Sequence, residues 1–188
     1  QPLRDKIQNK NKIILITTSR LVQKNAIGDV IRALKFLPDT VIFQILGMGP
    51  EKENLQLLTH NLKLENRVEF LGNVGHDDIP KYLHTADIFV RPSLSEGMGN
   101  SFIEAMAAGL PIVGTPIGGI PDFLKDGETG FFCEANNPES IARAVRQLVL
   151  DDKKREQIIS NARKMVEERY DWSMIVTDIK KRVFSHIF

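Results

Sequence analysis

The sequence predicts an α/β fold with a doubly wound parallel sheet of about six strands. Strand-like segments alternate with helix-like segments along most of the chain, and this order is typical of parallel strands joined by right-handed crossovers. A hydrophobic content of 42% with 26% charged residues is that of an ordinary globular domain and not of a disordered or fibrous chain. We therefore treat the 188 residues as one domain with a sizeable core.

The individual elements follow from apolar periodicity. Short β-branched or apolar runs predict strands over residues 12–18, 41–46, 68–71, 88–90, 111–114 and 130–133. Apolar residues at spacings of three and four, such as Ile27, Val30, Ile31 and Leu34, predict helices with one buried face. The expected helices cover residues 26–36, 51–62, 79–84, 101–108, 138–150, 153–168 and 173–184.

Charge and cysteine content exclude several classes of protein. The 25 basic and 24 acidic side chains leave a formal charge of +1, so no long-range field attracts nucleic acid or acidic lipid. The single cysteine, Cys133, excludes an internal disulfide bond and predicts a buried structural thiol. The chain has no Asp-x-Asp motif, and its four histidines lack the spacing of metal ligands, so we predict no metal site.

Polar and flexible residues gather in the segments that follow the predicted strands. In an open parallel sheet, ligands bind outside the carboxyl ends of the strands. Arg20 and Lys24 follow the first strand, and eight glycines fall in these loops: Gly47, Gly49, Gly72, Gly75, Gly97, Gly99, Gly118 and Gly119. Turns need glycine in any case, but a backbone that approaches a ligand closely also needs residues without side chains.

The loop from Glu96 to Ser101 leads directly into a helix. Free amides at a helix start form a site for phosphate, and Arg20 and Lys24 could bring two positive charges to the same rim. Each basic residue could instead be a solvated surface group. Ser101 and Glu104 have the spacing of a capping box, which favours a purely structural role for Glu104, whereas Glu96 could be an exposed loop acid.

Residues 91–111 read RPSLSEGMGNSFIEAMAAGLP, in which seven residues separate Glu96 from Glu104. This stretch resembles the signature of the family 4, or group 1, retaining glycosyltransferases. Similar segments follow the family's order along nearly the whole chain: Ser19 to Val22 with Lys24 as a basic loop, residues 46–50 as a glycine turn, Gly118 to Asp122 with Gly127 and Gly130, and Tyr170 to Trp172. Met48 and Asn25 depart from the common pattern, in which many relatives carry an acidic residue and a glycine.

The resemblance implies a Rossmann-like domain over residues 1–188 that forms the carboxy-terminal, donor-binding half of a GT-B enzyme. An amino-terminal acceptor domain is then expected to precede Gln1, and the chain alone is expected to be inactive. The implied reaction is a metal-independent transfer of a hexosyl group from a nucleotide-diphosphate sugar, with retention of configuration and without a further cofactor. The resemblance also implies a cytoplasmic enzyme of polysaccharide or glycoconjugate synthesis, and it allows association with the inner face of a membrane.

The resemblance also assigns roles to residues. Arg20 and Lys24 would hold the diphosphate, Glu96 would contact hydroxyls of the donor sugar, and Glu104 would accept hydrogen bonds from the ribose. The other residues implied in donor binding are Gly97, Met98, Gly99, Asn100 and Ser101 near phosphate and sugar, and Gly47, Gly49, Gly72, Val74 and Gly75, the last three in the segment expected at the base.

Two other readings compete with this one. The chain could be a complete, non-catalytic module that binds a nucleotide sugar and needs a partner chain for activity. It could also be a dinucleotide-binding domain of the dehydrogenase type. The second of these is disfavoured because no G-x-G-x-x-G motif follows the first predicted strand.

Overall fold

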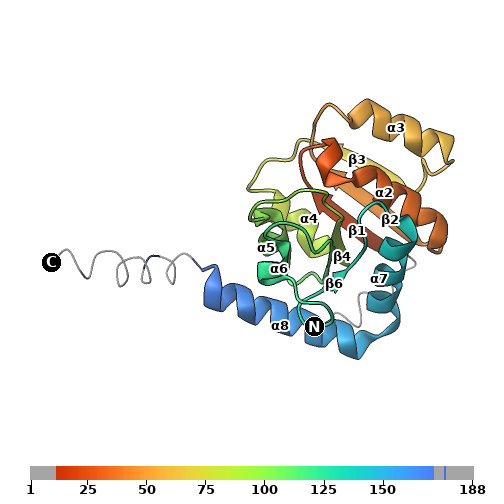
Figure 1. Ribbon diagram of the computed structural model, residues 1–188. Coiled ribbons are helices and arrows are strands. Elements are labelled where there is room, and N and C mark those ends of the chain that lie inside the picture. Colours follow the sequence, from red (N-terminus) through yellow and green to blue (C-terminus); the bar gives the residue numbers. More distant parts are fainter. Residues whose placement is uncertain (1–11, 172–175, 177–188) are drawn as a thin grey trace.

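The computed structural model describes residues 12–171 and 176 of the chain. Within these residues the chain forms one parallel sheet with helices on both faces (Figure 1). The strands pair in the order β3-β2-β1-β4-β5-β6. They are β1 (Ile13–Thr18), β2 (Val41–Leu46), β3 (Val68–Gly72), β4 (Ile88–Arg91), β5 (Ile112–Gly114) and β6 (Phe131–Phe132). The predicted α/β class with a doubly wound, six-stranded parallel sheet is therefore confirmed.

Helices connect successive strands, and two more helices follow β6. They are α2 (Ile27–Ala33), α3 (Lys52–Asn61), α4 (Ile79–Thr85), α5 (Asn100–Ala107), α6 (Ile120–Phe123), α7 (Pro138–Leu150) and α8 (Asp152–Arg169), with single 3₁₀ turns at η1 (Gln23–Asn25) and η2 (Leu34–Phe36). No helix in the described part of the chain is long and apolar enough to cross a membrane.

Three elements differ from the sequence-based prediction. The helix expected over residues 26–36 starts one residue later, because Ala26 has a φ of 50° and lies outside helical geometry, and it ends in the 3₁₀ turn η2. The short helix α6 was not predicted; it begins after Gly119 with a proline in its first turn. The helix expected over residues 173–184 lies outside the described residues.

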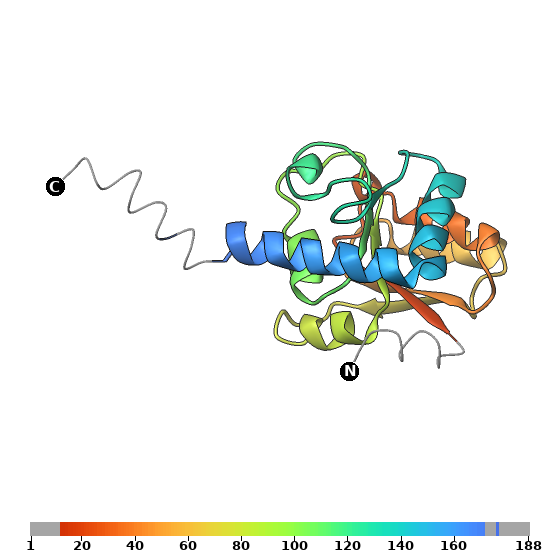
Figure 2. The same cartoon turned by 90° about the horizontal axis from the view of Figure 1, so that it is seen from below.

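The alternation of side chains along the strands divides the core into two clusters. Leu15 packs into the cluster under α2 and α7, while its neighbour Ile16 packs into the cluster under α5 and α6. Helix α8 joins the two, because Ile158 lies in the first cluster and Ala162 in the second. Figure 2 shows α8 running from the end of α7 towards α5.

The direction in which strands are added to the sheet reverses at β1. The chain proceeds from β1 outward to β3, then returns to the other side of β1, where Leu15 pairs with Ile88 and Ile16 with Phe89. The loops after β1 and β4 consequently lie side by side, and the backbone N–H of Leu94 donates to the carbonyl oxygen of Lys24 at 2.6 Å. Ligands of doubly wound sheets bind at such a reversal.

The loop after β5 supports the loop after β4 through direct backbone packing. Gly118 has a φ of +60°, and a Cβ atom at this position would lie 1.9 Å from the carbonyl oxygen of Glu96. The next residue, Gly119, donates its N–H to the carbonyl oxygen of Gly97 at 3.1 Å. Glycine at position 118 is therefore required both by backbone conformation and by space.

Replacing Gly118 with alanine should lower the free energy of unfolding by about 2 kcal/mol or more, because left-handed backbone is strained for alanine and the added carbon clashes with backbone. Urea denaturation measures this change. Gly97→Ala is the matched control, because a Cβ atom there meets nothing within 4 Å, and it should cost less than about 0.5 kcal/mol. Equal stabilities for the two variants would contradict the described loop packing.

Candidate functional site

Two adjoining cavities lie where the loops after β1 and β4 meet. Cavity A has a volume of about 680 Å³, and cavity B has a volume of about 430 Å³. Ser19, Arg20, Asn100 and Ser101 line both, so the two cavities share one wall. Both are open to solvent at the carboxyl edge of the sheet, the edge at which this fold binds ligands.

The structure brings most of the residues singled out in the sequence to these two cavities. Cavity A is lined by Arg20, Lys24, Glu96, Met98, Gly99, Asn100 and Ser101 together with Ser19, Val22, Asn25 and Arg91. Cavity B is lined by Gly47, Val74 and Glu104 together with Thr18, Ser19, Arg20, Leu46, Met48, Asn73, Ile79, Asn100 and Ser101. Gly49, Gly72, Gly75 and Gly97 line neither cavity.

Gly49 shows why some of the glycines in the loops after the strands contact neighbouring protein and not a cavity. A Cβ atom on Gly49 would lie 2.2 Å from the carbonyl oxygen of Leu21, and Leu21 donates its N–H to the carbonyl oxygen of Met48 at 2.9 Å. The glycine turn after β2 therefore packs backbone to backbone against the loop after β1. The sequence suggested that glycine here lets the backbone approach a ligand. In the structure, Gly49 instead lets the backbone of one loop approach the backbone of another.

The loop after β1 holds two exposed cations at cavity A. The buried side chain of Asn25 donates to the carbonyl oxygen of Arg20 at 2.7 Å, which fixes the conformation of the loop. Lys24 is tied through its own carbonyl to the loop after β4. Within the described part of the chain, neither Arg20 nor Lys24 forms an ion pair. Both positive charges are therefore uncompensated by protein at the rim of the cavity.

The start of helix α5 corrects one sequence-based expectation. Gly99, with a φ of +73°, is the N-cap, and no side chain caps the helix, so the capping box expected from Ser101 and Glu104 is absent from the described structure. The Ser101 hydroxyl instead accepts a hydrogen bond from Arg91 Nη1 at 2.6 Å. Since a guanidinium can only donate, Ser101 keeps its O–H as a donor. The third amide of α5, that of Phe102, donates to the carbonyl oxygen of Gly99 at 2.9 Å, which leaves the amides of Asn100 and Ser101 without a partner within the helix.

Glu96 is not the exposed loop acid that its sequence context allowed. Its side chain is 13% exposed and forms an ion pair of 2.5 Å with Arg91. One carboxylate oxygen accepts from Arg91 Nη2 and the other from the backbone N–H of Gly97 at 3.1 Å. Burial lowers the pKa of Arg91 from its ordinary value, and the Glu96 charge opposes this shift.

Glu104 lies on α5 at the opposite end of the shared wall, beside cavity B. Its side chain is 40% exposed, and Oε1 is 3.7 Å from Nε2 of His76, which is in the loop after β3. With no capping role in α5, its carboxylate is available to a ligand in cavity B.

Arg91 and Ser19 are the main residues at this site that the sequence reasoning did not select. Arg91 is 5% exposed although it is charged, and a charged residue at the end of an otherwise apolar strand was the available signal. Ser19 follows β1 directly, lines both cavities, and its buried Oγ has no hydrogen-bond partner among the described residues.

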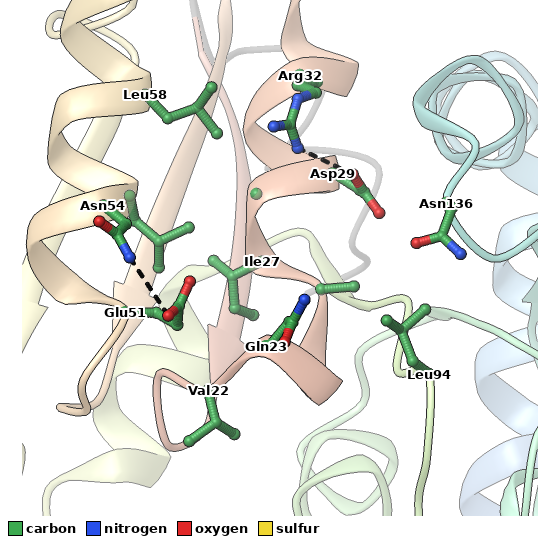
Figure 3. Close-up of a pocket in the computed structure, with 13 residues that line it drawn as sticks. Val22, Gln23, Ile27, Asp29, Arg32, Glu51, Asn54, Leu58, Leu94 and Asn136 are labelled. Carbon is green, nitrogen blue, oxygen red and sulfur yellow. Dashed lines mark hydrogen bonds and ion pairs between the residues drawn. The ribbon is translucent and has the colours of Figure 1, made fainter.

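A third cavity, cavity C, is separate from the selected residues. It has a volume of about 290 Å³ and lies between α2 and α3, with Leu94 and Asn136 on its far side (Figure 3). Its polar side chains are largely paired with one another, since Arg32 contacts Asp29 at 3.1 Å and Asn54 contacts Glu51 at 3.3 Å. None of the residues that the sequence analysis assigned to ligand binding lines cavity C.

Cys133 is the buried structural thiol that the sequence predicted. It is 3% exposed, and burial raises the pKa of its thiol to about 12, which leaves it protonated and unreactive at neutral pH. Among residues 12–171 there is no group of three or more His, Cys, Asp or Glu side chains that could hold a metal ion.

Comparison with known proteins identifies relatives along nearly the whole chain. Residues 2–165 match the family model described as glycosyl transferases group 1. The chain is 32% identical over 171 residues to N-acetyl-alpha-D-glucosaminyl L-malate synthase of Bacillus anthracis, covering 90% of the chain and 44% of that protein. It is 30% identical to the sulfoquinovosyl transferase SQD2 of Arabidopsis thaliana, covering 98% of the chain and 36% of that protein. The chain thus spans less than half the length of these relatives.

Solved structures agree with these matches. The crystal structure of HepE from Anabaena in complex with UDP superimposes with a TM-score of 0.88 at 28% identity, over 97% of this chain and 51% of that one. The C-terminal domain of a group 1 glycosyl transferase, LpcC from Francisella tularensis, gives a TM-score of 0.76 at 25% identity over 92% and 94% of the two chains. The fold and the family model agree, and the chain belongs to the group 1 glycosyltransferases.

Proposed function

We propose that this chain is the donor-binding domain of a retaining glycosyltransferase that transfers a hexosyl group from a nucleotide-diphosphate sugar. The proposal rests on one observation: two cations without an ion-pair partner, Arg20 and Lys24, line cavity A together with the first two residues of α5, whose amides are unpartnered within the helix. Paired positive groups of this kind suit a diphosphate. Volumes of about 680 Å³ and about 430 Å³ on the two sides of the shared wall leave room for a sugar in one cavity and a nucleoside in the other.

The proposed donor lies with its diphosphate at the shared wall. Its sugar occupies cavity A beside Glu96, and its ribose and base occupy cavity B beside Glu104 and Val74. Glu104 accepts hydrogen bonds from ribose hydroxyls, as carboxylates do in related nucleotide folds. HepE, a structural neighbour of the same fold, was solved in complex with UDP, which supports a nucleotide as the ligand; its placement at this edge of the sheet follows from the fold.

The proposed chemistry uses fixed charge. When the bond between the anomeric carbon and phosphate breaks, the sugar gains oxocarbenium character and the diphosphate gains negative charge. Arg20, Lys24 and the first amides of α5 stabilise that charge more in the transition state than in the bound donor, which lowers the barrier without a metal ion. Retention follows if the acceptor enters on the face that the diphosphate leaves, and the proposal assigns no nucleophile to Glu96.

The proposal places the acceptor on a separate amino-terminal domain. Support comes from the lengths of the relatives, since the chain covers 51% of HepE but 94% of the isolated C-terminal domain of LpcC. On this proposal the chain alone binds the donor and transfers no sugar.

Loss of the two cations should weaken diphosphate binding selectively. We expect the double variant Arg20→Ala with Lys24→Ala to bind UDP or GDP about 10- to 100-fold more weakly than the native chain, because charge-assisted hydrogen bonds to the phosphates are lost. Binding of uridine or guanosine should change less than about twofold. Calorimetry measures the nucleotides, and NMR titration measures the weaker nucleosides.

The control removes two positive charges elsewhere. Lys35 and Lys153 are exposed and line neither cavity, so the double variant Lys35→Ala with Lys153→Ala should keep native affinity for UDP and GDP. Equal losses for nucleotide and nucleoside in the Arg20 and Lys24 variant would refute the assigned diphosphate contact.

Glu104 should recognise the ribose hydroxyls. We expect Glu104→Ala to weaken binding of UDP about 10-fold, because the carboxylate that accepts from both hydroxyls is removed. Binding of 2′,3′-dideoxy-UDP, which lacks these hydroxyls, should be nearly unchanged by the same substitution, and GDP and its dideoxy form provide the parallel pair. Glu53→Ala, which removes an exposed carboxylate of α3, is the control. An equal loss with both nucleotides would rule out a ribose contact.

A further inference from the structure

Arg91 is the least explained charged residue at the site. It is the last residue of β4, and its side chain is 7% exposed beneath cavity A, which it helps to line. Burial of a guanidinium is unfavourable unless hydrogen bonds and charge compensate for lost water. The inference that follows rests on the proposed function, because it concerns how that site holds the sugar of the donor.

The guanidinium is anchored on three sides. Nη1 donates to Ser101 Oγ at 2.6 Å and to the carbonyl oxygen of Thr18 at 3.3 Å, so it joins the start of α5 to the end of β1. The guanidinium carbon Cζ lies over the ring of Phe102, 4.4 Å from the ring centroid. Nε has no hydrogen-bond partner among the described residues. These contacts leave Arg91 little freedom to change rotamer.

The remaining arm of the guanidinium holds Glu96. Nη2 donates to Oε2 of Glu96 at 2.5 Å, while Oε1 accepts from the N–H of Gly97 at 3.1 Å. Each carboxylate oxygen therefore uses one lone-pair direction inside the protein and keeps another free. Because Glu96 lines cavity A, its free lone pairs can accept hydrogen bonds from hydroxyl groups there.

Lysine would not reproduce this arrangement. The two terminal nitrogens of arginine lie at a fixed spacing in one plane and here reach Ser101 and Glu96 at the same time. A lysine ammonium is a single point that keeps the charge but cannot span both partners. The forked shape of the guanidinium, with its two terminal nitrogens, sets the direction of the Glu96 carboxylate together with its charge.

We propose that Arg91 is a positioning residue that fixes the Glu96 carboxylate so that it accepts hydrogen bonds from hydroxyls of the donor sugar. On this proposal Arg91 acts on the sugar through Glu96 and not by direct contact. This role differs from that of Arg20 and Lys24, which face the diphosphate. If Arg91 has this role, substituting it should reduce the contribution of the sugar to the binding free energy more than the contribution of the nucleotide.

The test uses Arg91→Lys, which keeps the charge and removes the fork. Calorimetry measures the dissociation constants of UDP and UDP-glucose, and of GDP and GDP-mannose, for the native chain and the variant. For the pair that binds, the ratio of the affinity for the nucleotide sugar to that for the nucleoside diphosphate should fall about 10-fold. Arg143→Lys, the same substitution at a residue whose side chain is 62% exposed, should leave this ratio unchanged.

A double-mutant cycle shows whether Arg91 acts through Glu96. Glu96→Gln keeps the shape of the side chain and should by itself lower the same ratio. If Arg91 works through Glu96, the second substitution should add little. The ratio for the double variant Arg91→Lys with Glu96→Gln should then lie within about twofold of the ratio for Glu96→Gln alone. Additive losses in the cycle would overturn the positioning role.

The possible failures are distinguishable. Equal losses for nucleotide and nucleotide sugar in Arg91→Lys, or a fall in stability with an unchanged ratio, would show that Arg91 only joins β1, β4 and α5, and would overturn this inference alone. If the native chain binds none of the four nucleotides, the proposed function fails and the role of Arg91 fails with it. Glu96→Gln keeps the inference falsifiable if Arg91→Lys does not fold, because an unchanged ratio in that variant contradicts it directly.

Discussion

The pairing of β1 with β4 is the constraint on which the site depends. It places the end of each strand beside the other, so the basic loop and the start of α5 meet although about 80 residues separate them in the sequence. Three contacts hold this junction: the Leu94 N–H on the Lys24 carbonyl, and Arg91 Nη1 on both Thr18 and Ser101. Cavities A and B exist because these loops meet without filling the space between them.

Packing of one loop backbone against another explains several of the glycines that follow the strands. The loop after β2 rests on the loop after β1 at Gly49, and the loop after β5 rests on the loop after β4 at Gly118. In both places a side chain would strike a carbonyl group of the neighbouring loop. A rigid rim of this kind lets a few side chains, such as Arg20, Glu96 and Glu104, face the cavities from defined positions.

The sequence predicted the fold well because the strands are short, apolar and separated by amphipathic helices, and parallel sheets are built from such patterns. It also selected Arg20 and Lys24 from their position after the first strand, and Glu96 from the resemblance to a glycosyltransferase signature. It was wrong about the capping box, because spacing alone cannot show that Gly99 caps the helix and that Ser101 pairs with Arg91 instead. Arg91 was missed because Thr18 becomes its neighbour only through the pairing of β1 with β4, and because its contacts with Glu96 and Ser101 depend on how the loop between β4 and α5 folds.

The central claim is that the ligand of this domain lies across cavities A and B with its phosphates between the basic loop and α5. Backbone amide NMR of the chain during titration with UDP and with GDP tests this most directly. The account predicts that the largest shifts occur at the amides of Arg20, Lys24, Asn100 and Ser101, which surround the shared wall. Shifts concentrated at Gly28 and Asn54 around cavity C, with the shared wall unaffected, would contradict it.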